Sequence, residues 1–115
     1  MKLEVLKYLK DVQNSIDEII EFTEGLCSFK DFTSDKRTLF ATEKKLVVNG
    51  EAIQGLLHKN PEIEITNARR IVRFRNRMAH KYDQVDFVLV WSIAINHLIP
   101  LKDEVKILIS KYSTE

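Results

Sequence analysis

An all-α fold is predicted from three features of the sequence: its composition, the spacing of its apolar residues and its scarcity of turn-forming residues. The chain has 115 residues, of which 44% are hydrophobic and 30% charged, a balance typical of one globular domain. Only three glycines and two prolines are present, which leaves little material for tight hairpins. Apolar residues recur every three or four positions, without any useful length of period-two alternation. We expect four to five helices packed as an antiparallel bundle in a single domain, residues 1–115.

The first helix is expected around the apolar residues from Leu6 to Ile20, which stand at three- and four-residue steps between lysine, aspartate and glutamate. Gly25 is a suitable stop for this helix. The linker "LCSFKDFTSDK" follows, and we expect its two phenylalanines to pack a turn of structure against the core.

The second helix is expected to begin near Ser34 and Asp35, either of which can cap it. Gly50 lies inside this helix, in "VVNGEAIQGLL", and costs about 1 kcal/mol of helix propensity relative to alanine. It marks either a close approach of two helices or a tolerated flaw. Pro61 in "HKNPE" disfavours helical geometry in the residue before it and so ends the helix.

Capping residues also predict where the later helices begin. Thr66 or Asn67 can cap a third helix through "ARRIVRFRNRMA", and Asp86 can cap a fourth, "FVLVWSIAINHLI". We expect Pro100 to kink or break the fourth helix, after which "LKDEVKILISKY" continues as a last helical stretch.

The charge and the cysteine content limit which binding partners and which cellular compartment the sequence is compatible with. The formal net charge is +1, so any contact with nucleic acid must come from a local basic patch. The single Cys27 cannot form an intramolecular disulfide and has no neighbouring metal ligands. The amino terminus lacks a signal-peptide pattern, and no uncharged apolar run approaches the length of a membrane span. The sequence predicts a soluble, cytoplasmic domain with no membrane contact.

A basic cluster occupies the predicted third helix. Five arginines stand between positions 69 and 77, namely Arg69, Arg70, Arg73, Arg75 and Arg77. Three of them, at positions 69, 73 and 77, are four apart and share a helix face. Guanidinium groups suit phosphate recognition, so this helix is a candidate contact for a nucleic-acid backbone. The alternatives are a solvated arginine-rich face and a partner for an acidic surface.

Arg75 and His80 together could support RNA cleavage. The histidine can exchange protons near neutral pH, while the arginine can hold a phosphate and stabilise charge in a transition state. That chemistry is attack of a 2′-hydroxyl on the adjacent phosphate, and it needs no metal. Five residues apart, the two side chains point about 140° away from each other on an unbroken helix. Either the helix ends near Met78 or Ala79, or the groups meet across a subunit interface.

The remaining polar residues carry weaker signals. Glu51 could pair with an arginine of the third helix, either to orient a site or only to tie helices together. His58 and His97 lack metal-ligand spacing and are expected to be structural, and Trp91 is expected in the core. The sequence has no motif for a metal, a cofactor, a phosphate-binding loop or a catalytic serine or cysteine.

The segment "RNRMAHKY" (75–82) resembles the R-x4-H-x-Y signature of HepT-like ribonuclease toxins, a branch of the HEPN superfamily. Four other stretches, in order along nearly the whole chain, resemble the family too: "YLKDVQNSIDEIIEF", "GEAIQGLL", "ITNARRIVRFRN" and "HKYDQVDFVLVWSIAINHLIPLKDEV". The resemblance implies an HEPN-like helical bundle that dimerises through its motif-bearing face.

Residue roles follow from the same resemblance. Arg75 and His80 would form the metal-independent ribonuclease pair, with Asn76 accompanying the arginine. Tyr82 would be the residue that an MntA-type nucleotidyltransferase antitoxin modifies with AMP to silence the toxin. A two-fold homodimer, or a larger assembly with the antitoxin, would double the motif into one composite site.

The sequence departs from the family pattern at two positions, and two other functions remain as alternatives to a ribonuclease toxin. Lys81 stands where glycine or an acidic residue is expected, and Pro100 comes one residue later than usual. With the remaining four arginines, Lys81 is a candidate contact for RNA or antitoxin. The alternatives are a non-catalytic module that binds a nucleotidyltransferase or RNA without cutting it, and an unrelated helical scaffold with a basic face.

Overall fold

Helices make up most of the computed structural model, which describes residues 2–66, 68–80 and 86–114. These ranges contain six helices and no strand: α1 (Lys2–Thr23), α2 (Phe29–Ser34), α3 (Lys36–Lys59), α4 (Ala68–His80), α5 (Phe87–Asn96) and α6 (Leu98–Thr114). The predicted all-α class is therefore confirmed. Among the described helices, none combines the length and the apolar character needed to cross a bilayer.

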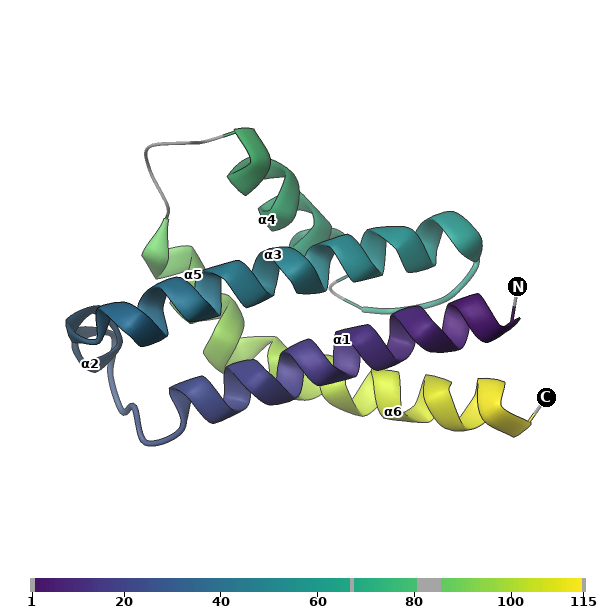
Figure 1. Ribbon diagram of the computed structural model, residues 1–115, viewed down its shortest axis with the longest axis horizontal. Helices are drawn as coiled ribbons and strands as arrows, with labels where there is room; N and C mark the ends of the chain where they lie inside the picture. Colours follow the sequence, from purple (N-terminus) through teal and green to yellow (C-terminus); the bar gives the residue numbers. More distant parts are fainter. Residues whose placement is uncertain (1, 67, 81–85, 115) are drawn as a thin grey trace.

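The long helices α1 and α3 lie side by side and antiparallel, with α6 beside α1, and both chain ends lie at the same end of the bundle (Figure 1). The apolar stripe of α1 faces this bundle, because Leu9, Val12, Ile16 and Ile19 are fully buried. Polar groups also join α1 to α3. The amide of Asn49, a fully buried side chain, donates hydrogen bonds to the Ser15 hydroxyl (2.7 Å) and the Val12 carbonyl (3.3 Å).

The linker after α1 contains a helix that brings the count to six in the described residues. Gly25 adopts a φ of 85°, which suits the predicted stop after α1. Ser28 then caps α2 by accepting a hydrogen bond from the Asp31 backbone N–H (3.2 Å). Phe32 is fully buried and stacks on Trp91, with ring centroids 5.0 Å apart. The predicted packing against the core is confirmed for Phe32 and Trp91, but it was wrong for Phe29, which is exposed.

Capping residues set the ends of α3 as predicted. Asp35 accepts hydrogen bonds from the Thr38 hydroxyl and backbone N–H, and these bonds lower the pKa of its carboxyl group. At the other end Asn60 is the capping residue, immediately before Pro61. α4 begins at Ala68, and Asn67, one of its two predicted caps, lies outside the described residues.

The predicted break of the fourth helix near Pro100 is confirmed, although it falls three residues before the proline. Asp86 caps α5 as expected, accepting a hydrogen bond from the Leu89 backbone N–H (3.1 Å). That helix nevertheless ends at Asn96, and the break falls at His97. Pro100 is the third residue of α6. In a first helical turn the backbone N–H has no intrahelical acceptor, so a proline there costs no hydrogen bond.

Candidate active site

Helices α3 and α4 approach each other so closely at Gly50 that no space is left for a side chain there. A Cβ atom added to Gly50 would lie 2.6 Å from the Cβ of Arg75 and 3.1 Å from the carbonyl oxygen of Ile71. Carbon atoms attract one another best at about 3.5–4.0 Å, so a larger residue fits only if α4 moves away. The predicted close approach at Gly50 is confirmed, and it places the base of the Arg75 side chain directly against α3.

Arg75 is held by polar groups on both helices. Its Nε lies 3.9 Å from Oε1 of Glu51 on α3, and its NH1 donates a hydrogen bond to Oδ1 of Asn76 (3.1 Å). The predicted pairing of Glu51 with an arginine is thus confirmed. The Glu51 side chain is 54% exposed, so the ion pair contributes only about 0–1 kcal/mol to stability. The Nε of Arg75 is buried and makes no hydrogen bond to a described residue.

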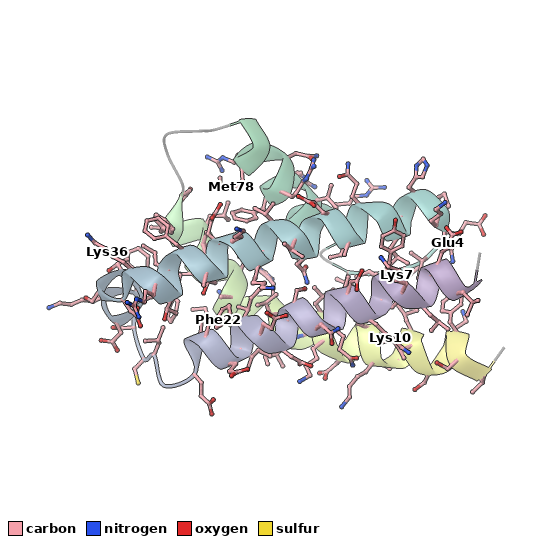
Figure 2. The ribbon with its side chains drawn as sticks, viewed as in Figure 1. Glu4, Lys7, Lys10, Phe22, Lys36 and Met78 are labelled. Carbon is pink, nitrogen blue, oxygen red and sulfur yellow. The ribbon has the colours of Figure 1, made fainter. Side chains whose placement is uncertain are left out.

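The two sides of α4 differ in character. Ile71, Phe74 and Met78 are buried, and Met78 lies on the side of α4 that faces α3 (Figure 2). The opposite side carries Arg69, Arg73 and Arg77, and all three are exposed. The predicted sharing of one face by these arginines agrees with their helical positions.

Arg70 is the one arginine of the group with a partner that the sequence did not indicate. Its NH1 lies 2.6 Å from Nε2 of His97, at the break between α5 and α6. Burial lowers the pKa of His97, and the nearby positive charge of Arg70 lowers it further. This contact gives His97 the structural role expected of it, and it joins α4 to the α5–α6 junction. His58 lies in the last turn of α3, also as expected.

His80 is the last residue of α4, one residue beyond Ala79, so the helix ends close to the predicted place. Whether the same copy or a second one brings His80 to Arg75 stays a prediction. Lys81 and Tyr82 lie outside the described residues.

A groove of about 300 Å³ runs between α3 and α4 beside Arg75. It is lined by Glu43, Lys44, Val47, Glu51, Arg75 and Met78. Glu43 is partly buried there, which raises the pKa of its carboxyl group. Sequence reasoning missed this residue, although its spacing of eight from Glu51 places both on one face of α3.

A second groove, of about 460 Å³, lies between α1 and α3. Its walls include Asp11, Glu18 and Glu51, and Lys45 is paired with Glu18 at 2.9 Å. These carboxylates repel phosphate, so the groove beside Arg75 is the better candidate for RNA. Within the ranges that the structure describes, no three histidine, cysteine, aspartate or glutamate side chains are grouped so that they could hold a metal ion.

Comparison with known proteins gives one consistent result. A family model described as "Ribonuclease HepT-like" matches residues 12–108. A protein of Thermococcus cleftensis named "Probable ribonuclease HepT" is 34% identical over 89% of this chain and 93% of its own length. A Methanocaldococcus jannaschii protein named "Putative RNase MJ1380" is 30% identical over 92% of this chain and 97% of its own length. No solved structure is significantly similar to the chain.

Proposed function

The chain belongs to the HepT-like ribonuclease family, and on that premise we propose that it is a metal-independent endoribonuclease, the cytoplasmic toxin of a toxin–antitoxin pair. One observation carries the proposal. The Cβ of Arg75, the first residue of the R-x4-H-x-Y signature, lies against α3 at Gly50, and its side chain lines the groove between α3 and α4 beside Glu51. Its Nε is buried without a hydrogen-bond partner among the residues that the structure describes, so the guanidinium group has a donor available for a phosphate.

The reaction is attack of a ribose 2′-hydroxyl on the adjacent phosphorus. The 2′-oxygen forms a bond to phosphorus, the bond to the 5′-oxygen breaks, and the products are a 2′,3′-cyclic phosphate and a 5′-hydroxyl. His80 transfers one of the two protons that this exchange requires, and Arg75 stabilises the charge that develops on the phosphate oxygens. Arg69, Arg73 and Arg77, exposed on the side of α4 away from α3, are candidate contacts for the RNA backbone or the antitoxin.

The geometry of α4 supports a site shared by two copies of the chain. Positions 75 and 80 are about 140° apart around an ideal helix, and this spacing favours a site in which the two residues come from different copies. In a two-fold dimer that joins the α4 helices, the His80 of a second copy would complete the site around Arg75. The control of the enzyme is proposed from the family pattern: an MntA-type nucleotidyltransferase adds AMP to Tyr82 and silences the toxin.

The test is RNA cleavage by the purified protein in EDTA. The wild type should produce cyclic-phosphate ends, and His80→Ala should lower the rate by about 10²- to 10⁴-fold. His58→Ala is the matched control, because His58 is exposed at the other end of the bundle, in the last turn of α3, and should leave the rate unchanged. A requirement for a divalent metal would refute the mechanism. RNA binding without any cleavage would favour the non-catalytic module instead.

A further inference from the structure

The groove beside Arg75 contains two carboxylates in different surroundings. Glu43, Val47 and Glu51 stand four residues apart on one face of α3, and eight residues of helix rise about 12 Å. Glu51, at one end of the groove, forms its ion pair with Arg75. Glu43, at the other end, forms no ion pair with any residue that the structure describes, and its carboxyl group is partly buried.

A partly buried carboxylate gains free energy from any ligand that brings hydrogen-bond donors to it. Burial has removed some of the water molecules that would donate hydrogen bonds to the carboxylate, and a ligand donor can take their place. Glu51 is paired with Arg75, so Glu43 is the carboxylate in this groove whose oxygens can accept hydrogen bonds from a ligand. The partial burial, reflected in its raised pKa, agrees with a binding role.

Apolar side chains lie between the two ends of the groove. Val47 is half-buried on α3, and Met78, on α4, is 9% exposed. A flat heteroaromatic ring can lie against such a surface, and a methionine sulfur makes favourable contacts with aromatic rings. The order along the groove is therefore a phosphate-binding arginine, an apolar surface and a carboxylate. A nucleotide presents a phosphate, a flat ring and the polar edge of that ring in the same order.

We propose that this part of the groove is a subsite for a guanine base next to the phosphate bound by Arg75, with the Glu43 carboxylate accepting hydrogen bonds from the N1–H and the N2 amino group. Guanine alone among the RNA bases offers two adjacent donors on its Watson–Crick edge, and a carboxylate offers two acceptors. Uracil offers one N–H between two carbonyl oxygens that repel a carboxylate. Adenine and cytosine place an acceptor nitrogen beside their amino group.

This inference rests on the proposed ribonuclease function, and it specifies which RNA base the enzyme prefers next to the scissile phosphate. Its test uses short RNA substrates with one cleavable linkage, in which the base next to the scissile phosphate is guanine or hypoxanthine. Hypoxanthine lacks only the N2 amino group, so it removes one of the two proposed hydrogen bonds. The enzymes compared are the wild type, Glu43→Gln and Glu21→Gln. Glu21 is the matched control, because it is an exposed carboxylate on α1 that does not line the groove.

In the wild type and in Glu21→Gln, replacing guanine by hypoxanthine should lower kcat/KM by about tenfold or more. In Glu43→Gln the two substrates should be cleaved at nearly equal rates, because the carboxylate that reads the amino group is gone. Dissociation constants of non-cleavable 2′-O-methyl versions should show the same pattern in the His80→Ala background. That second measurement separates base recognition from proton transfer.

Two results would overturn the subsite. One is a wild type that cleaves both substrates equally, and the other is a guanine preference that survives unchanged in Glu43→Gln. Either result would leave the proposed ribonuclease function intact, because the wild type would still cleave RNA. A wild type that cuts neither substrate would instead refute the proposed function, and the inference would fall with it.

Discussion

Replacing Gly50 with alanine tests whether the α3–α4 contact positions Arg75. The added Cβ would lie 2.6 Å from the Arg75 Cβ, about 1 Å inside a normal carbon–carbon contact. It would also lie 3.1 Å from the Ile71 carbonyl oxygen, so relief requires movement of the α4 backbone itself. Alanine gains about 1 kcal/mol of helix propensity, and overpacking of this kind costs about 1–3 kcal/mol.

We therefore expect Gly50→Ala to lower the free energy of unfolding by about 1 kcal/mol, measured by urea denaturation. RNA cleavage should fall much further, because a displacement of about 1 Å at a catalytic group can cost about 100-fold in rate. Gly55→Ala is the matched control in the same helix. The three atoms nearest to its Cβ all belong to the outer end of the Tyr8 side chain, the nearest at 2.7 Å, and this half-buried side chain can move aside more easily than a helix backbone.

Gly55→Ala should thus keep the propensity gain and full activity. The reasoning would be refuted by a Gly50→Ala protein that is as stable and as active as Gly55→Ala. Equal losses in both variants would also contradict it, because only Gly50 faces α4.

Two further predictions concern Tyr82 and His97. Tyr82→Phe should abolish labelling of the protein by its nucleotidyltransferase partner with radioactive ATP, and continued labelling would reject Tyr82 as the acceptor. The pKa of His97 is lowered in the folded protein, so the unfolded chain binds a proton more readily, and stability should fall as the pH drops through about 6.5. Urea unfolding at pH 7.5 and pH 5.5 should show a larger loss for the wild type than for His97→Gln; equal losses would exclude this contribution.

Features that depend on neighbouring residues were predictable from the sequence. Asp35 and Asp86 cap helices because a short acidic side chain reaches the backbone N–H three residues ahead. Gly50 signalled a close approach because a glycine inside a helix is costly unless something needs the space. α2 follows the same local logic, since Ser28 and Asp31 have the spacing of a capping pair, but the prediction gave it no helix.

Features that depend on distant residues were not predictable. Arg70 meets His97 across 27 positions, and nothing near either residue indicates the contact. Pro100 indicated the break between α5 and α6, but its exact place, at His97, was not predicted. For the candidate site, the sequence provided Arg75 and its Glu51 partner. It could not show that Glu43 shares their groove, because that depends on how α4 crosses α3.

The packing of α4 on α3 has a consequence for how much of the enzyme is active at any moment. α4 has 13 residues, and a helix of that length is only marginally stable alone in water. Its helical state therefore depends on docking, chiefly against α3. With Arg75 as the proposed phosphate-binding residue, the active fraction would be set by a local unfolding equilibrium, in which a docked α4 presents Arg75 and a detached α4 does not. Any ligand that binds only the docked form raises that fraction by mass action.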